Sequence, residues 1–422
     1  MRPRRTQRGL AGVCATALAG SAVLLAASPA GGDDAGLSRY LDPATAPFIP
    51  IPEIDLDPYS GTTLGLIPTV LHTNAQNEID EIIAPDVIHN QYFGWGSRMR
   101  VFGYPSVDEE WMVVGGGKQR VEREFDARFV SGETRHSALS WSIEAVYDRS
   151  GSPRFFGIGN DSLYSNQTNY LDNQSRLDVQ VGRNFSPAVQ LAYLVRVRYV
   201  DVLPGVLPQV PSITTLFPGQ AGLGAEHEVQ QRLILSYDTR DSPIIPRSGV
   251  HYLVYAGTVT RGLGSSVSYD FVGAEAAGYR PLTPELTLAW HAAVRYMPSA
   301  NEAPFWALSG LGGDVSIPGE SEPLRTDGSD RYLDRDLSAG GVELRTRVAN
   351  YDAFGTRVSL ELAPFVDVGK VFDDAGASPL SHLHRAVGLG MRGIASPHVV
   401  GYVDIGFGER RAAVFSGINY PF

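Results

Sequence analysis

Apolar and polar residues alternate along much of the chain with the period of two that β-strands produce. In the segment 189–201 every second residue is apolar, and Gln190, Arg196 and Arg198 lie between the apolar positions. The same rule holds in later segments, among them 284–297, 336–349 and 356–370. One face of each segment is therefore apolar and the other polar, which predicts an antiparallel sheet and an all-β fold.

About sixteen such segments are present, an even number typical of barrels that have both ends on one side of a membrane. We expect strands near 62–73, 85–94, 97–105, 110–129, 137–149, 174–184, 189–201, 226–239, 249–261, 267–281, 284–297, 336–349, 356–370, 384–393, 398–407 and 412–421.

The connections between these strands differ in length, and we expect the two kinds at opposite ends of the barrel. Short turns are expected at Gly94-Trp95-Gly96, Ser186-Pro187-Ala188, Thr283-Pro284-Glu285 and Ala395-Ser396-Pro397. Long connections are expected at 150–173, 202–225, 298–335 and 371–383. Short periplasmic turns and long external loops are typical of outer-membrane barrels.

Alternation alone fits a soluble β-sandwich as well as a membrane barrel. Aromatic residues near strand ends favour the barrel, because they form girdles at both membrane interfaces. Candidates for these girdles are Trp141, Tyr147, Tyr199, Tyr296 and Tyr420. The sequence therefore predicts a transmembrane antiparallel β-barrel over residues 62–422.

The first thirty residues predict export. Arginines come first, an apolar stretch follows, and Ser28-Pro29-Ala30 places small residues at a cleavage position. We interpret residues 1–30 as a signal peptide, with a retained transmembrane anchor as the alternative. Residues 31–61 are rich in proline and predict an extended periplasmic linker. After Ala30 no apolar run is long enough for a transmembrane helix.

Charge and cysteine content narrow the choice of partners. The net charge of −11 should repel nucleic acid, so we expect no nucleic-acid partner. Cys14, inside the predicted signal peptide, is the only cysteine, so the rest of the chain has neither a disulfide nor a thiolate metal site. We expect no cofactor and no metal.

Two motifs carry a family resemblance. Residues 324–334 read Leu-Arg-Thr-Asp-Gly-Ser-Asp-Arg-Tyr-Leu-Asp, and residues 365–369 read Phe-Val-Asp-Val-Gly. Together they resemble the loop signature and neighbouring strand of the BamA/TamA-type outer-membrane barrels, the bacterial surface antigen family. Thr326 and Asp327 depart from the family's glycine and aromatic residue. Residues 237–249, with Asp-Thr-Arg-Asp-Ser-Pro and a later Pro-Arg-Ser-Gly, also resemble a turn of this family.

The resemblance implies a latch in the barrel lumen. The connection 298–335 would fold inward, and Arg325 would meet Asp367. Glu343 shares the inward parity of Asp367, and we expect both carboxylates to pair with Arg325. If Arg325 does not pair with Asp367, we expect Arg331 to take its place. The alternative is a solvated external loop in which the arginine has no such role.

The C-terminal residues resemble an insertion signal. Val414, Ile418, Tyr420 and Phe422 follow the period of two, and a terminal aromatic residue marks outer-membrane barrels for assembly in proteins of this kind. The alternative is a strand that ends in phenylalanine by chance.

The resemblance implies a barrel that assists insertion, assembly or export of proteins or lipids, with an openable seam between its first and last strands. Because the linker 31–61 is too short for the family's periplasmic POTRA domains, we expect a barrel-only member. Its partners would be outer-membrane lipids, unfolded barrel clients and a separate periplasmic docking protein. The alternative is a partly plugged pore or structural barrel.

The sequence contains no convincing catalytic motif, and we expect that the protein is not an enzyme. There is no Gly-x-Ser-x-Gly, and Gly115-Gly116-Gly117-Lys118 lacks the spacing of a phosphate loop. His382 and His384 lie in a predicted loop, where solvated histidines are the simpler interpretation than a metal site.

Overall fold

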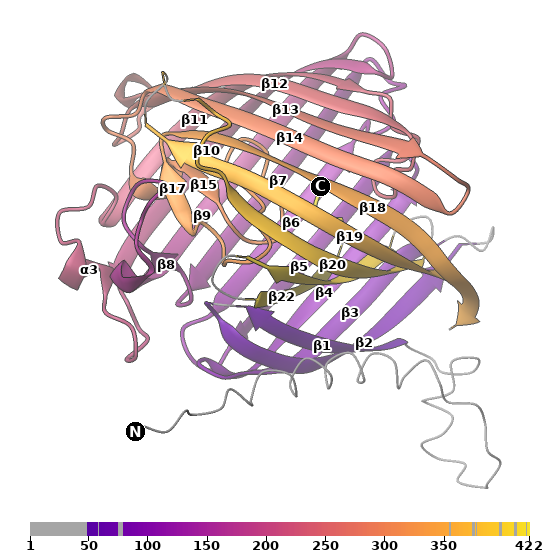
Figure 1. Cartoon of the computed structure of the whole chain (residues 1–422). Helices are drawn as coiled ribbons and strands as arrows, with labels where there is room; N and C mark the ends of the chain where they lie inside the picture. Colours follow the sequence, from indigo (N-terminus) through magenta and orange to yellow (C-terminus); the bar gives the residue numbers. More distant parts are fainter. Residues whose placement is uncertain are drawn as a thin grey trace, which may run out of the picture.

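The computed structural model describes residues 49–57, 59–74, 79–353, 356–373, 376, 378–395, 399–408, 412–418 and 420–422. The predicted signal peptide 1–30, the first part of the predicted linker and the turn residues 396–398 lie outside these ranges. Within them, strands dominate and form a large antiparallel barrel (Figure 1). No helix in this described part is long and apolar enough to cross a membrane.

Eighteen strands of the described chain form the wall, each paired antiparallel with the next. They are β1 (Ile49–Asp57), β2 (Gly61–Thr73), β3 (Ile79–Asn90), β4 (Gly94–Ser106), β5 (Glu109–Lys118), β6 (Arg123–Ser131), β7 (Leu139–Ser150), β9 (Thr168–Asn184), β10 (Val189–Pro204), β11 (Gly224–Asp238), β12 (Gly249–Val259), β13 (Tyr269–Pro281), β14 (Leu286–Ser299), β18 (Asp336–Ala353), β19 (Thr356–Phe372), β20 (His384–Ala395), β21 (Val399–Phe407) and β22 (Ala412–Ile418).

The connections hold the remaining short elements. These are β8 (Arg154–Phe155), η1 (Tyr164–Asn166), α3 (Ile213–Leu216), η2 (Arg261–Leu263), η3 (Phe305–Ala307), β15 (Ser309–Leu311), β16 (Ser321–Glu322) and β17 (Tyr332–Asp334). The last three form a small separate sheet in the order β16-β15-β17.

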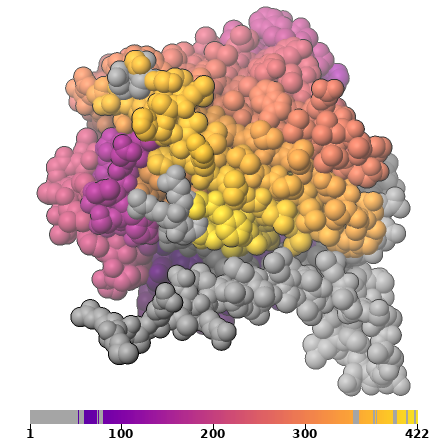
Figure 2. All heavy atoms as spheres, viewed as in Figure 1, coloured from indigo at the N-terminus to yellow at the C-terminus, as the bar shows by residue number. Residues whose placement is uncertain are grey.

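Successive side chains of the wall point to opposite faces, as predicted. In β10, Tyr193 and Val197 are 44% and 49% exposed, whereas Gln190 and Arg196 are both 7% exposed. On the coloured part of the face seen in Figure 2, side chains fill the gaps between the ribbons. The apolar face is therefore the outer one, and the polar face lines the lumen.

The aromatic girdle is confirmed at four of its five predicted positions. Trp141, Tyr147, Tyr199 and Tyr296 are exposed on the outer face. The prediction is wrong for Tyr420, whose ring lies inside the barrel against Arg345. The chain leaves the strand at Ile418, so the period of two no longer applies at Tyr420.

The long connections share one end of the barrel, as the sequence predicts. They are those between β7 and β9, β10 and β11, β14 and β18, and β19 and β20. The short turn near Gly94 was predicted at the opposite end. This prediction is wrong, because antiparallel pairing places the turn between β3 and β4 at the same end as the long connections.

A missed turn caused this error. The predicted strand 110–129 is two strands, β5 and β6, joined by a tight turn at 119–122. Val121 adopts a positive φ of 60°, which β-branched residues rarely do. No glycine or asparagine marks the turn, so no residue of segment 119–122 signals it.

The barrel also begins earlier than predicted. Ile49–Asp57 was placed in the linker, but it forms β1 and pairs with β2 along its whole length. Pro50 and Pro52 favoured the linker interpretation, yet proline is tolerated in a strand that needs a ladder on one side only. With β1 included and 110–129 divided, the wall has eighteen strands in place of about sixteen.

Buried apolar residues lie mainly inside the barrel, between the wall and the connection that follows β14. One cluster joins Tyr255, Phe271 and Met297 of the wall to Ala303 and Ala307 of that connection. A second cluster around Phe155 and Phe305 lies at the end with the long connections. The lumen is therefore packed at this end.

Candidate functional site

The connection between β14 and β18 folds into the lumen, as predicted for 298–335. Its small sheet β15–β17 contacts the wall strands β18 and β19. Leu311, Leu324 and Tyr332 pack with wall residues of these and the next strand, Leu337, Val371 and Ala386. We call this connection the lumen loop. Its apolar contacts explain why it does not extend into solvent.

Arg325 of the lumen loop is fully buried among three carboxylates of the wall. Its Nε and Nη2 donate to the two oxygens of Asp367 at 2.8 and 2.7 Å. Its Nη1 donates to Glu343 Oε1 at 2.5 Å and to Asp404 Oδ2 at 2.7 Å. This forked geometry satisfies the planar guanidinium on both edges, which a lysine could not do.

The face of Arg325 is also covered. Its guanidinium carbon lies 3.5 Å from the ring centre of Phe365 in β19. Burial disfavours the charged guanidinium, but Asp367, Glu343 and Asp404 outweigh this effect and hold the pKa of Arg325 well above its ordinary value. Arg325 therefore stays charged throughout the pH range in which the protein can be studied.

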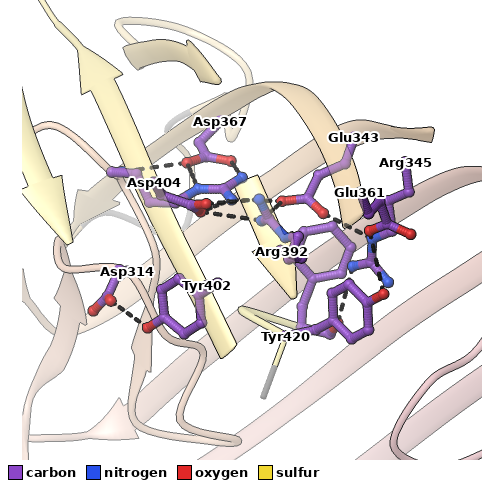
Figure 3. A network of polar contacts seen from close by, with 11 residues as sticks. Asp314, Glu343, Arg345, Glu361, Asp367, Arg392, Tyr402, Asp404 and Tyr420 are labelled. Atoms are coloured by element: carbon purple, nitrogen blue, oxygen red, sulfur yellow. Dashed lines mark hydrogen bonds and ion pairs between the residues drawn. The ribbon is translucent and has the colours of Figure 1, made fainter. Parts of the chain in front are cut away.

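Two further arginines balance the carboxylates (Figure 3). Arg392 of β20 pairs with Asp404 at 2.7 Å and with Glu343 at 3.1 Å. Arg345 of β18 donates from Nε to Glu343 Oε2 at 2.8 Å. We call Arg325, Glu343, Asp367, Arg392 and Asp404 the latch cluster. Such a buried cluster fixes geometry more than it adds stability, because desolvation offsets much of the attraction.

Glycines let the loop and the wall approach closely. A Cβ atom on Gly406 of β21 would lie 1.4 Å from the backbone oxygen of Arg325. A Cβ atom on Gly390 of β20 would lie 1.4 Å from Nη1 of Arg392. Any larger residue at either position would displace the latch cluster.

The structure brings together the predicted residues Arg325, Glu343 and Asp367, whereas Arg331 does not join them. Arg331 lies over the rings of Phe156 and Tyr332, at 4.2 and 4.3 Å from their centres. It donates to the backbone oxygen of Ser162 at 2.7 Å. The expectation for Arg331 as a substitute is wrong, because its guanidinium lies among Phe156, Tyr332 and Ser162 and not beside the carboxylates.

The sequence interpretation missed Arg392 and Asp404. Both lie within predicted strands and share the inward parity of buried neighbours such as Ile394 and Tyr402. Parity could therefore have placed them in the lumen. It could not have placed them beside Arg325, because that contact depends on the register of strands distant in sequence.

Other contacts attach the lumen loop farther along its length. Asp314 accepts a hydrogen bond from Tyr402 at 2.5 Å, and the backbone N–H of Gly319 donates to Glu275 at 2.7 Å. Glu320 forms an ion pair with Arg196 of β10. The loop is thus attached to both middle strands (β10, β13) and a late strand (β21) of the wall.

The Glu320 contact predicts a specific response to pH. Although burial disfavours its charged form, Arg196, Arg198 and Arg232 hold the pKa of Glu320 well below the ordinary 4.5. A depressed pKa stabilises the folded state above the unfolded-state value, and this stabilisation is lost as the pH falls through the folded value. We therefore expect no loss from this group between pH 7 and 5, and a progressive loss below 4.5.

Thermal unfolding of the purified barrel in detergent, measured from neutral pH to about pH 3, checks this expectation. Glu320→Gln should flatten the acid part of the profile relative to the wild type. Parallel profiles for the two proteins below pH 4.5 would contradict the assignment.

The predicted insertion signal lies partly inside the lumen. β22 ends at Ile418, and the Tyr420 ring stacks on the Arg345 guanidinium at 3.9 Å. The Phe422 ring lies 4.2 Å from the ring centre of His291. Recognition during assembly precedes this folded state, so a role for Tyr420 and Phe422 in insertion stays a prediction.

His382 lies in the connection between β19 and β20, and His384 is the first residue of β20. The His384 ring stacks on Tyr332 at 3.8 Å, and His382 lies in a left-handed backbone conformation with φ 54°. Among the residues that the structure describes, no group of three or more His, Cys, Asp or Glu side chains could hold a metal ion.

Comparison with known protein families agrees with the barrel fold. Residues 110–397 match the Omp85 superfamily domain, which is more than half of the chain. The chain belongs to the Omp85 superfamily. It is therefore an outer-membrane β-barrel protein, and the resemblance expected from the two motifs is confirmed.

Two solved structures are similar to the chain. CdiB from Escherichia coli has 10% sequence identity over 85% of this chain and 68% of its own, with a TM-score of 0.55. BamA from Haemophilus ducreyi lacking POTRA domains 1-3 has 10% identity over 84% of this chain and 74% of its own, with a TM-score of 0.49. No curated protein sequence matches the chain. At this identity the likeness to CdiB shows a shared fold.

Proposed function

We propose that this Omp85 barrel assists the insertion, assembly or export of proteins or lipids at the outer membrane through a seam that opens between β1 and β22. One observation carries the proposal. Among the described residues, β1 is registered with β2 at nine consecutive positions, from Ile49 to Asp57, but with β22 only at the pair Leu56 and Val414. The junction of the first and last strands is thus the weakest in the wall.

Composition weakens the same junction further. Beyond Leu56, the register would next place Ile54 opposite Ser416 and Pro52 opposite Ile418. Pro50 and Pro52 lie an even number of residues from Leu56 in β1. Proline has no N–H to donate to a ladder. A net hydrogen bond contributes only about 1 kcal/mol, so few bonds oppose separation here.

An open seam gives a physical mechanism. Separation of β1 from β22 exposes backbone N–H and C=O groups to the bilayer, where unpaired groups are costly. A client strand that adds to the free edge satisfies these groups, as in β-strand addition elsewhere. No covalent step is needed, and the clients would be unfolded barrel strands that a separate periplasmic docking partner delivers.

The latch cluster would keep the rest of the wall intact while the seam moves. Its carboxylates come from β18, β19 and β21, and Arg392 comes from β20. Arg325 thereby joins β18, β19 and β21 directly, and Arg392 adds β20 through Glu343 and Asp404. Separation is then confined to the strand that follows them, β22, which makes Arg325 a positioning residue for the seam.

The second candidate function is a partly plugged pore or structural barrel. It is favoured by the attachment of the lumen loop to opposite parts of the wall through Glu320 and Arg325. A barrel of this kind needs a closed wall and would pass small solutes around the loop.

Reconstitution into liposomes separates the two candidates. We expect an added unfolded outer-membrane barrel to acquire its heat-resistant folded form several times faster with this protein than in empty liposomes or with the heat-denatured protein. Planar-bilayer recordings of the same preparation should show no steady open channel. A steady channel without faster client folding would favour the pore.

A further inference from the structure

Two arginines lie directly opposite each other on the outer face of the wall. Arg123 of β6 and Arg149 of β7 are paired in register, and the next pair on the same face is Phe125 and Tyr147. The side chains of that pair point outward, because Phe125 is 44% exposed and Tyr147 is 37% exposed. Like charges directly opposite each other on one face of a sheet are destabilising. The arginine pair is therefore unfavourable unless an anion neutralises it.

Hydrogen bonds within the protein do not neutralise the pair. Arg123 Nη1 donates to the backbone oxygens of Lys118 and Glu122, both at 2.6 Å, which orients the side chain but leaves its charge unpaired. The carboxylate of Glu122 lies 3.5 Å from the ammonium group of Lys118 instead. Within the described part of the chain, Arg149 has no hydrogen bond or ion pair, and its Nε is buried without a partner.

The carboxylates closest in sequence face the other way. Glu124 and Asp148 follow and precede the two arginines, so they have the opposite parity and face the lumen. Asp201 of β10 shares the outer face, but Asn173 of β9 lies between it and Arg149 in the register. An anion that neutralises the pair would therefore come from outside the protein.

The depth of the pair in the membrane indicates the kind of anion. β7 enters its long connection just after Arg149, at the end that is external in outer-membrane barrels. Tyr147 belongs to the aromatic girdle, whose side chains lie at the level of the lipid headgroups. Two residues of a strand advance about 7 Å. The two guanidinium groups thus lie at the outer edge of the girdle, where the phosphate groups of outer-leaflet lipids are found.

The strand next to Arg123 leaves space on the outer face. Gly117 of β5 is opposite Arg123, and Gly115 is opposite Phe125, so β5 has no side chain in either row. A Cβ atom on Gly115 would contact only Phe125, at 3.9 Å. Glycine inside a strand often marks a position where a ligand approaches closely. An acyl chain can lie against this part of β5, below a headgroup held by Arg123.

We propose that Arg123 and Arg149 form a binding site for a phosphate group of an outer-leaflet lipid. A guanidinium group binds phosphate through two parallel N–H···O bonds, and two opposed arginines can hold one phosphate between them. The phosphate removes the repulsion between the arginines. The site lies on β6 and β7, which do not border the seam between β1 and β22, so the proposal goes beyond the proposed function and does not depend on it.

Lipid binding to the folded barrel tests the site. Native mass spectrometry of the purified protein in detergent, titrated with lipid A, measures the fraction of protein that carries lipid. We expect Arg123→Gln/Arg149→Gln to bind lipid A at least about tenfold more weakly than the wild type, because charge-assisted bonds to phosphate are lost. Each single variant should lose part of this affinity. Lipid A without its phosphates should bind the wild type as weakly as lipid A binds the double variant.

Arg183→Gln/Arg280→Gln is the matched control. Both residues are exposed arginines on the outer face, but they lie at the end with the short turns, and the variant loses the same charge. It should bind lipid A as the wild type does. Equal affinity of the wild type and Arg123→Gln/Arg149→Gln would overturn the site, and so would an equal loss in the control. Displacement of lipid A by an equal concentration of inorganic phosphate would show a site for free phosphate and overturn the assignment to a lipid. Heat-modifiable mobility shows that each variant is folded.

Discussion

Replacing Arg325 with alanine is expected to destabilise the barrel more than any other single substitution in the lumen. The change leaves Glu343, Asp367 and Asp404 buried with fewer cations than carboxylates. Removal of one partner from a buried ion pair typically costs about 3–5 kcal/mol. Unfolding of the purified barrel in denaturant, followed by its change in mobility on a denaturing gel, measures the loss.

The conservative variants make this test specific. Arg325→Lys keeps the charge but cannot fork to Asp367 and Glu343 together, so it should retain only part of the stability. Asp367→Asn should also destabilise. In the double variant Arg325→Ala/Asp367→Asn the losses should fall well short of additive, because each change removes the same interaction. Additive losses, or a stable Arg325→Ala protein, would contradict the latch cluster.

Much of the wall could be predicted from the sequence, because the residue types of each strand alternate between its lipid-facing and lumen-facing sides. Tyr193 and Arg196 lie in the same strand, but Tyr193 faces outward and Arg196 faces the lumen. Lipid and lumen favour different residue types on these two faces. The pairing of Arg325 with Asp367 came from a family resemblance and from parity, and the structure brings those residues together.

The features that sequence could not predict depend on distant contacts. Val121 forms a turn without a turn residue, and β1 contains prolines that are tolerated only because its second edge is almost unpaired. Tyr420 leaves the period of two because its ring stacks on the guanidinium of Arg345, which is distant in the sequence. Gly406 looks like any strand glycine until the loop backbone lies against it.

The first strand predicted from the sequence, 62–73, is not at the seam in the structure. Leu66 of this segment lies in β2 and is paired with Pro52 and Val87, so it is not at the junction that closes the wall. The pair that spans the junction is Leu56 and Val414. Directly opposite residues in an antiparallel pair are close enough for a disulfide with small adjustment.

A disulfide between Leu56→Cys and Val414→Cys is therefore expected to abolish client insertion and leave the fold intact. Cys14 lies in the predicted signal peptide and no other cysteine is present, so the new pair has no competing thiol in the barrel. The oxidised protein should show the usual heat-modifiable mobility but fold no clients in liposomes, and a reductant should restore the rate. Each single-cysteine variant is the control and should act as the wild type does.

The same pair in cells gives the most direct measurement of whether the seam must open. Under oxidising conditions, cells that depend on the crosslinked protein should show the phenotype of cells without it, and reduction should reverse this. If the crosslinked barrel supports the wild-type phenotype and folds clients at the wild-type rate, the seam does not open in function and the partly plugged barrel is the correct account.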